Sequence, residues 1–518
     1  MPTAETSFDV IVIGAGISGL AAAHYLRKLC PTKSFVLLER RERLGGTWDL
    51  FKYPGFRTDS DMCTFGFSFK PWRGKRGTGV AGRDVNRYLN DMATEENVRR
   101  NIRCGVNAKR AHWSTSEARW DVTCVVGEEE VHFSSRFLCG AAGYYDPRKG
   151  FTPDFAGLDT FQGSIAHPHV WPTELEIAGK RVAMIGSGAT AVTMAPALVE
   201  AGAAKVTMVQ RSPSFIMPCA STNAATVGPW NDVLSWVLRG PFASLFGPSL
   251  AHKLVRLHKN CYDAAFYALC MWFPRFLTTV SLAIIWIYGS VHAGWPLPLR
   301  SFRRDFVPSY HMWTQRVCLS PDGDFYAALG TGTLNVVTSA VESITPRGIQ
   351  LTSGEHVDAD IIVTATGFHL STFGFTDLEF AVDGEHYPVS VNGRGRLTYK
   401  GVTTDRLPNC VAIVGYTNQS WTLKAELIAS YLCRLVNYMD QHGYSKVQAV
   451  PSKEVVENAT QYFPLQSGYL SRSKHLLPLQ GPQAPWCATQ NYLLDLWRLW
   501  LAPLDDGHLV FERPTSGS

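Results

Sequence analysis

The chain has 518 residues, a length that allows roughly three compact units and excludes a small single-module protein. Hydrophobic residues make up 46% of the chain and charged residues 18%, against a usual charged share of about 25%, so we expect a large buried core. The 49 Lys and Arg against 44 Asp and Glu leave a net charge of +5, which is too small for a nucleic-acid-binding protein of this length. We therefore expect a small-molecule partner.

The twelve cysteines are spaced too widely to form a redox pair or a paired zinc site. Even the closest two, Cys261 and Cys270, do not form a CxxC motif. Unpaired thiols are typical of a reducing compartment. Residues 1–7 are polar and lead directly into an apolar run, without the basic start and long apolar core of a signal peptide. These features predict a cytoplasmic protein.

The first predicted nucleotide-binding motif is a GxGxxG pattern that follows an apolar strand at residues 8–13 and opens a helix. Gly14 allows a tight turn, Gly16 lets the backbone approach a pyrophosphate, and Gly19 permits close packing of the helix. The alternative is an ordinary strand–helix–strand unit without a ligand. The pattern favours the nucleotide-binding interpretation because strand, turn and helix occur in the required order.

The strand after this motif indicates which nucleotide is bound. It is expected at residues 34–38 and ends at Glu39. A carboxylate at this position accepts hydrogen bonds from a ribose and repels a 2′-phosphate. The first site is therefore predicted to bind FAD or NAD.

A second motif of the same kind starts with an apolar strand expected at residues 181–185. Its turn has Ala in place of the third glycine and comprises Gly186, Ser187, Gly188, Ala189, Thr190 and Ala191. The next expected strand, residues 205–209, is followed by Gln210 and Arg211, at the same offset as Glu39 in the first unit. An arginine here is suited to bind a 2′-phosphate, so this site is predicted to bind NADPH.

Two nucleotide sites in one chain indicate a flavoprotein that takes hydride from NADPH. Disulfide reductases share this layout, but they need a redox-active cysteine pair that the cysteine spacing excludes. With no metal pattern and no second organic acceptor, O2 is the expected oxidant. A membrane-bound or scaffold flavoprotein that passes electrons to O2 as hydrogen peroxide remains an alternative.

Residues 276–299 form an apolar segment without acidic or basic residues apart from His292. Polar residues, glycines and prolines interrupt it, so it predicts a helix followed by a loop rather than a membrane-spanning helix. The helix is expected to be buried or to make peripheral contact with a membrane. The wider region 215–306 is rich in Trp, Phe, Leu and Pro, and is expected to form helical walls around a substrate.

A longer motif, FxGxxxHxxxWP, occupies residues 161–172 and contains His167 and Trp171. Its five specified residues should coincide by chance in about one of 10⁴ such chains. On this motif the chain resembles the type I Baeyer-Villiger monooxygenases, and it looks most like the ethionamide-activating type of mycobacteria. The stretches that extend the resemblance are residues 45–48, 53–61, 313–316, 321–324, 364–368, 415–422 and 490–492.

The resemblance implies an FAD- and NADPH-dependent enzyme that converts ketones to esters or lactones through a C4a-peroxyflavin. Arg316 matches the family's catalytic arginine, which stabilises the peroxyanion, and Asp59 matches the carboxylate that orients it. Gln315 stands where related enzymes commonly have Lys, which removes one cation expected near the NADPH phosphate. The alternative is an N- or S-oxygenating flavin monooxygenase acting on sulfides, thioamides or amines, against which Trp171 and Arg316 argue.

We predict an α/β fold with two Rossmann-like dinucleotide-binding domains and a helical insertion. The FAD-binding domain is expected at residues 1–148 and 368–518, and the NADPH-binding domain at 149–367, with the insertion at about 215–306. His167 is expected to be a hinge residue rather than a catalytic one. The predicted cofactor-binding residues are Gly14, Gly16, Ser18, Gly19, Glu39, Gly46, Thr47, Trp48, Arg57, Asp59, Gly186, Ser187, Gly188, Ala189, Thr190, Ala191, Gln210 and Arg211.

A helix expected at residues 419–435 follows a strand at 410–415. The N-terminal amide groups of such a helix are suited to stabilise negative charge on a reduced flavin. Its other interpretation is plain packing against the sheet. The substrates expected from all of these features are a small ketone or sulfide and O2.

Overall fold

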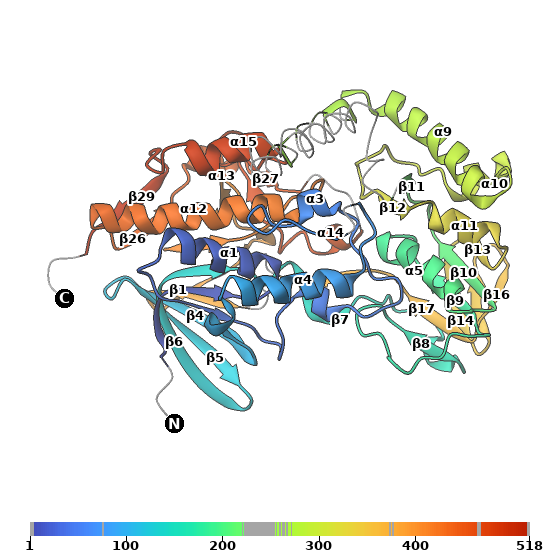
Figure 1. Cartoon of the computed structure of the whole chain (residues 1–518), viewed down its shortest axis with the longest axis horizontal. Coiled ribbons are helices and arrows are strands. Elements are labelled where there is room, and N and C mark those ends of the chain that lie inside the picture. Colours follow the sequence, from blue (N-terminus) through green and yellow to red (C-terminus); the bar gives the residue numbers. More distant parts are fainter. Residues whose placement is uncertain are drawn as a thin grey trace.

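The computed structural model of the chain describes residues 5–74, 77–219, 221, 272–371, 374–375, 378–463 and 468–514, with a few further positions between 254 and 270. Two sheets lie at opposite ends of the molecule, each with helices packed against it (Figure 1). The predicted α/β class with two Rossmann-like units is confirmed.

The first sheet contains five parallel strands in the spatial order β3-β2-β1-β6-β25. This is the strand order of a dinucleotide-binding fold, in which the ligand lies at the carboxyl ends of the strands. These strands are β1 (Ser7–Ile13), β2 (Phe35–Leu38), β3 (Ile102–Arg103), β6 (Glu129–Gly140) and β25 (Cys410–Ala412). The strands that extend the sheet beside β6 are β5 (Arg119–Val126), β4 (Val106–Ser114), β19 (Glu379–Val382) and β20 (Glu385–Tyr387). Neighbouring strands in this extension are antiparallel, except that β19 pairs with β4 in parallel.

The side chains of β1 alternate between two cores because successive residues of a strand point to opposite faces. Val10 and Val12 pack against the helices α1 (Ile17–Leu29), α4 (Gly82–Glu95) and α12 (Trp421–His442). Ile11 and Ile13 pack in a second core with residues of β4 and β5. Figure 1 shows α1 and α12 side by side on the helical face. Helices from the two ends of the chain therefore cover one nucleotide-binding sheet.

The second sheet is parallel throughout, with the order β13-β10-β9-β17-β8. Its first four strands again follow the order of a dinucleotide-binding fold. Its strands are β8 (Ser164–Ala166), β9 (Arg181–Ile185), β10 (Lys205–Gln210), β13 (Leu334–Thr338) and β17 (Ile361–Thr364). The helices α5 (Ala189–Glu200) and α11 (Asp324–Gly330) pack with it in one core.

A two-stranded ribbon joins the two units where the chain passes between them twice. It consists of β7 (Tyr145–Gly150) and the antiparallel β18 (Phe368–Leu370). The N–H of Phe151 also donates to the carbonyl of Gly367 at 2.9 Å. The predicted domain boundaries, 148/149 and 367/368, fall in or beside this ribbon and stay a prediction.

Two sequence-based expectations differ from the structure. The helix predicted at 419–435 continues to His442, because Val436 and Met439 also pack into the core. The helical insertion was predicted from about residue 215, but residues 216–219 form β11 (Ile216–Cys219), which pairs with β12 (Cys318–Pro321). That pairing joins segments about a hundred residues apart, so local sequence does not reveal it. Most of 222–271 lies outside the described residues.

The remaining elements are α2 (Thr47–Leu50), α3 (Met62–Phe65), η1 (Arg99–Asn101), η2 (Leu158–Thr160), α9 (Pro274–Ala293), α10 (Leu299–Asp305), β14 (Val341–Thr345), β15 (Gly348–Leu351), β16 (His356–Asp358), β21 (Ser390–Val391), β22 (Arg394–Gly395), β23 (Thr398–Tyr399), β24 (Thr403–Thr404), β26 (Lys446–Ala449), α13 (Lys453–Glu457), β27 (Thr460–Gln461), α14 (Gly468–Arg472), β28 (Leu479–Gln480), α15 (Tyr492–Leu496), η3 (Trp497–Leu501) and β29 (Leu509–Glu512).

A fully buried ion pair anchors the C-terminal segment to α12. The Lys424 Nζ lies 3.2 Å from the Asp495 carboxylate, and both side chains are almost completely buried. Tyr416 also donates to Asp495 at 2.8 Å. Removing one partner of such a pair leaves an uncompensated buried charge.

We predict that Lys424→Met lowers the free energy of unfolding by about 3–5 kcal/mol, because Asp495 would stay buried without its cation. The double variant Lys424→Met/Asp495→Asn should regain part of this loss. Urea denaturation of the three proteins measures the difference. A single variant as stable as the wild type would contradict the prediction.

Candidate functional site

The first glycine turn joins β1 to α1 and leaves no room for side chains. Gly14 has φ +106°, and a Cβ there would lie 2.8 Å from the carbonyl oxygen of Ala141. A Cβ on Gly19 would lie 2.0 Å from the carbonyl oxygen of Gly14. The chain therefore turns directly from strand to helix, and the amide groups at the start of α1 face the space above the turn.

Glu39 is held at the end of β2, next to this turn. Its side chain is buried, and its carboxylate accepts hydrogen bonds from the backbone N–H groups of Ala15 at 2.8 Å and Arg41 at 3.0 Å. Ser18, in the first turn of α1, accepts a hydrogen bond from the Trp421 indole at 2.8 Å. Because a hydroxyl also donates, Ser18 keeps a proton for a ligand.

A further backbone turn at Gly46 lies against the first glycine turn. A Cβ on Gly46 would lie 2.9 Å from the Cα of Gly16, so the two turns make close backbone contact. The Arg41 guanidinium donates to the Gly46 carbonyl at 3.1 Å and to the Asp49 carboxylate at 2.6 Å. This arginine, which the sequence motifs did not single out, holds the second turn in place.

Thr47 and Trp48 begin α2 directly after Gly46. The Trp48 indole packs against Phe56 and Phe65, with ring centroids 5.2 and 5.4 Å apart. The glycine turns, the buried acid and this aromatic surface together fit an adenine dinucleotide of the FAD type.

The second glycine turn joins β9 to α5. Gly186 has φ +126°, and a Cβ there would lie 2.3 Å from the carbonyl oxygen of Ala365. A Cβ on Gly188 would meet no atom within 4 Å, so the backbone here faces open space. The Ser187 hydroxyl lies 3.2 Å from the Ser212 carbonyl, to which it donates. This turn also fits the pyrophosphate of a dinucleotide.

The first residues of α5 have different surroundings. Ala191 is fully buried in the core of the second sheet. Thr190 hydrogen-bonds with the Tyr53 side chain, whose burial raises the pKa of the phenol. Ala189 begins the helix. The segment that follows α2 in the first unit therefore contacts the start of α5 in the second unit.

Gln210 and Arg211 face different surroundings at the end of β10. Gln210 is buried, and its amide donates to the Asp305 carbonyl at 2.7 Å and to the Thr338 hydroxyl at 2.9 Å. These contacts give Gln210 a structural role, and its predicted cofactor contact stays a prediction. The Arg211 side chain is exposed at the strand end.

A second arginine, which the sequence motifs did not reveal, lies close to Arg211. Arg472, at the end of α14, has its guanidinium 3.6 Å above the Phe151 ring. Burial and the positive charge of Arg211 both lower the pKa of Arg472. The pKa of His369 is lowered mainly by burial, and the positive charges of Lys149 and Arg472 lower it further. Cations from both units therefore gather at the ribbon that joins them.

Arg316 and Asp59 form an ion pair between the two units. The Arg316 Nη2 lies 2.5 Å from the Asp59 carboxylate, and the Nη1 donates to the Thr417 carbonyl at 2.9 Å. Asp59 follows the FAD-side turns, Arg316 precedes β12, and Thr417 precedes α12. The structure thus brings both predicted catalytic residues together. Each keeps about two-fifths of its side chain exposed, 39% for Arg316 and 40% for Asp59.

The pKa of Asp59 shows which form this pair takes. Burial by itself would raise the pKa of the carboxyl group, but the charge of Arg316 and the hydrogen bond from it lower the pKa below its ordinary value. Asp59 is therefore ionised at neutral pH, and the pair is lost only as the pH falls through this lowered pKa.

Arg57 makes a second ion pair between the units. Its Nη1 donates to the Asp324 carboxylate at the start of α11. Its Nη2 is buried and has no hydrogen-bond partner among the described residues. One terminal nitrogen of Arg57, a predicted cofactor-binding residue, is therefore in an ion pair, and the other has no partner among the described residues.

His167 packs against the ribbon that joins the units. A Cβ on Gly150 would lie 1.8 Å from its ring, so the imidazole occupies the space that a side chain would need. The His169 N–H donates to its Nδ1 at 3.0 Å. Burial lowers the pKa of His167, so the ring is neutral at pH 7. Trp171, from the same motif, packs against the core of the second sheet.

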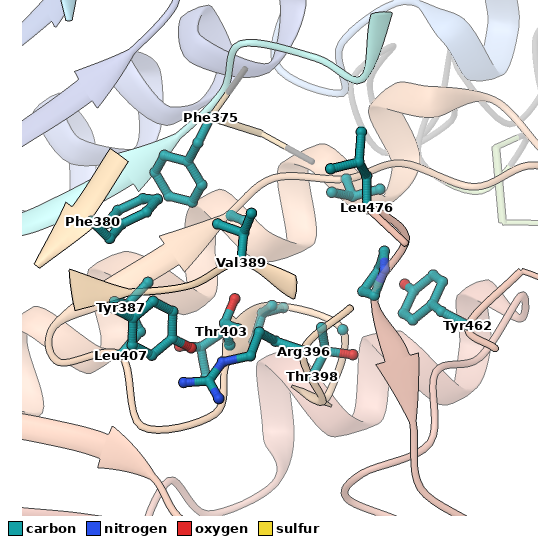
Figure 2. Close-up of a pocket in the computed structure, with 16 residues that line it drawn as sticks. Phe375, Phe380, Tyr387, Val389, Arg396, Thr398, Thr403, Leu407, Tyr462 and Leu476 are labelled. Carbon is teal, nitrogen blue, oxygen red and sulfur yellow. The ribbon is translucent and has the colours of Figure 1, made fainter. Parts of the chain in front are cut away.

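A cavity in the first unit contains none of the predicted site residues (Figure 2). Its volume is about 60 Å³, which is room for a few water molecules and not for a nucleotide. Phe375, Phe380 and Tyr387 line one side of it, and Arg396 lies over the Tyr387 ring at 4.1 Å. This cavity is therefore too small to be the nucleotide site.

The two glycine turns, and the strand order that the two sheets share, define a protein with two dinucleotide-binding units. Residues 12–73 match the NAD(P)-binding Rossmann-like domain family. The chain is 38% identical over 508 residues to the FAD-containing monooxygenase EthA of Mycolicibacterium smegmatis, covering 98% of this chain and 97% of the relative. It is 38% identical over 512 residues to the probable FAD-binding monooxygenase AlmA of an Acinetobacter species, with 98% and 97% coverage.

Solved structures with the same fold include an oxidised steroid monooxygenase bound to NADP. That structure has a TM-score of 0.72 and 22% identity, and the match covers 98% of this chain and 100% of the other. A cyclohexanone monooxygenase from Rhodococcus sp. Phi1, bound to NADP+, has a TM-score of 0.67, 22% identity, and 86% and 87% coverage.

Fold and site thus define a flavoprotein oxygenase with two nucleotide sites. The chain belongs to the family of FAD-containing monooxygenases. The family predicted from the sequence is confirmed, and with it the use of FAD. The expected second cofactor, NADPH, agrees with the NADP bound in the solved structures that share the fold.

We predict that Glu39→Ala lowers both the FAD content of the purified protein and its melting temperature, because a ligand that binds only the folded state stabilises it. Glu42→Ala, which removes an exposed carboxylate three positions away, serves as the matched control. Absorbance of the bound flavin and thermal unfolding measure the two effects. Unchanged FAD content in Glu39→Ala would contradict a ribose-binding role.

Proposed function

We propose that the chain is a Baeyer-Villiger monooxygenase that inserts one oxygen atom of O2 next to the carbonyl of a small ketone and so forms an ester or lactone. The observation that carries this proposal is the position of Arg316. Its guanidinium is fixed between Asp59 and the Thr417 carbonyl, where the two nucleotide-binding units meet. When bound, FAD accepts hydride from NADPH and activates O2.

The residues of this chain supply a fixed positive charge for the reaction. Negative charge develops on oxygen during insertion, and a positioned cation stabilises it more strongly than mobile water does. Arginine suits this role because its guanidinium stays protonated and presents a rigid, planar set of donors. Asp59 restricts the orientation of Arg316 but leaves much of the guanidinium side chain exposed, so that Arg316 can still contact a ligand. N- or S-oxygenation transfers an electrophilic oxygen and has no need for this cation.

We infer that Arg211 and Arg472 together bind the 2′-phosphate of NADPH. Arg211 belongs to the second unit, whereas Arg472 lies between β27 and β28 in the C-terminal part of the first unit. Their mutual repulsion, which contributes to the lowered pKa of Arg472, would be relieved by a dianion between them. Arg472 thereby replaces the cation that is missing at Gln315.

We predict that Arg316→Ala reduces the rate of ester formation by a factor of about 10² to 10³, the usual cost of removing one electrostatic partner of the transition state. FAD and NADPH should still bind, and residual NADPH oxidation should yield hydrogen peroxide. Arg316→Lys should not restore the rate, because a flexible ammonium does not reproduce the planar fork. Asp59→Ala should cause a smaller loss.

The assay follows ester by mass spectrometry, with Arg347→Ala, an exposed arginine of the turn between β14 and β15, as the control. Near-normal ester formation by Arg316→Ala would show that Arg316 is only structural. Efficient oxidation of sulfides or amines by the wild type, with no ketone converted, would favour N- or S-oxygenation.

For the second cofactor, we predict that Arg211→Ala and Arg472→Ala each weaken NADPH binding about 10- to 150-fold more than NADH binding, because only NADPH carries the 2′-phosphate. Steady-state KM values for both nucleotides measure this ratio, with Arg347→Ala again as control. An unchanged ratio in Arg472→Ala, with a changed ratio in Arg211→Ala, would assign the phosphate to Arg211 alone.

A further inference from the structure

The outer face of α9 is apolar along its whole length. Figure 1 shows α9 at the outer edge of the molecule, with α10 at its end. The outward side chains are 41–70% exposed and recur at intervals of one, three, four and eight residues, which place them on one side of a helix. They are Phe273, Phe276, Ile284, Ile287, Tyr288 and Val291.

The inner face of α9 packs on the second unit through apolar side chains such as Ile285, together with a few small and polar ones. Thr278 accepts a hydrogen bond from the Met312 N–H at 3.2 Å, and Ser290 accepts one from the Leu297 N–H at 3.0 Å. Gly289 lies so close to the Tyr326 ring that a Cβ would be 2.9 Å from it. Both faces of α9 are therefore largely apolar, and the polar outer face that a surface helix usually has is missing from this helix.

This packing decides between a spanning helix and one that lies in the membrane surface. Among the described residues, α9 is the helix long and apolar enough to cross a membrane by length and composition. However, its inner face is bonded to Met312 and packed on Tyr326 of the second unit, so lipid cannot surround it. A helix with one face on its own protein and the other apolar is suited to lie in the plane of the interface.

The charges around this face match an anionic surface. Arg275, Arg300 and Arg303 are exposed on α9 and α10. The acid in this stretch, Asp305, is buried and ion-paired with Arg304 at 2.7 Å. Basic residues beside an inserted apolar face strengthen binding to anionic lipids.

A second group of exposed apolar side chains belongs to α15 and η3, and comprises Leu493, Leu494, Trp497, Trp500 and Leu501. In Figure 1, α15 lies along the same edge of the molecule as α9. Tryptophan is enriched where proteins meet the membrane–water interface. Two separate segments therefore carry exposed apolar side chains of the kind that contact lipid.

We propose that α9, its basic neighbours on α10 and the α15–η3 surface dock the protein on an anionic lipid bilayer as a peripheral enzyme. A second copy of this chain fits the surface less well. A symmetric dimer would bring the arginines of α9 and α10 against the same arginines of the partner, with no unpaired acid from the stretch 272–305 to offset them.

The test uses the full-length FAD-loaded protein and sedimentation with vesicles of phosphatidylcholine, with and without phosphatidylglycerol. Wild type should sediment with the anionic vesicles, and added salt should weaken binding. The triple variant Phe276→Ser/Ile287→Ser/Val291→Ser should bind at least about tenfold more weakly, because it exposes three fewer apolar side chains to lipid. Its melting temperature and its NADPH oxidation rate should match the wild type.

The matched control replaces three exposed valines elsewhere, Val391→Ser/Val456→Ser/Val510→Ser, and should bind like the wild type. Should the α9 triple variant fold poorly, the exposed pair Arg300→Glu/Arg303→Glu keeps the test valid, since it should lose binding to anionic vesicles only. Vesicle binding is measured without ketone, so it does not depend on the proposed oxygenation.

Three outcomes would overturn the proposal. Wild-type protein that stays in the supernatant with anionic vesicles has no lipid-docking surface. Equal vesicle binding by the wild type and by the folded α9 triple variant, or by the arginine pair variant, would place the contact elsewhere. A wild-type dimer that the triple variant dissociates, without vesicle binding, would identify a second copy of the chain as the occupant.

Discussion

The ion pair between Arg316 and Asp59, which links the two nucleotide-binding units, is the interaction on which the proposed site depends. Arg316 and Asp59 are 257 positions apart, yet their side chains form an ion pair that closes the junction between the units. Each of the two sheets carries one glycine turn suited to a dinucleotide, and Arg57 with Asp324 forms a second ion pair between the units. Positioned charge at such a junction is effective because its geometry is set before a substrate arrives.

Features that depend on local spacing were predicted well from the sequence. The turn at Gly14 and the positions of Glu39 and Arg211 at strand ends follow from a strand–turn–helix pattern whose geometry is nearly the same in every dinucleotide-binding unit. The pairing of Arg316 with Asp59 was expected from the family resemblance alone. Nothing in the local sequence of Arg316 distinguishes it from a solvated loop arginine, because its partners lie in distant segments.

Features that depend on long-range packing could not be predicted. Arg472 meets Phe151 and Arg211 only after the C-terminal segment has folded back onto the ribbon between the units. Gln210 shares its strand end with Arg211, but the structure directs its amide into the core toward Asp305. The segment containing α9 is apolar on all sides, so its sequence does not reveal which face stays outside.

The fate of the oxygen atoms in wild-type enzyme tests the central claim most directly. Purified FAD-loaded protein is given NADPH, a small ketone and isotopically labelled O2, and the products are analysed by mass spectrometry. Baeyer-Villiger chemistry at the Arg316 junction predicts an ester or lactone that carries a single labelled oxygen atom, formed in step with NADPH consumption. Label found only in hydrogen peroxide and water, with the ketone unchanged across a panel of chain lengths, would contradict it.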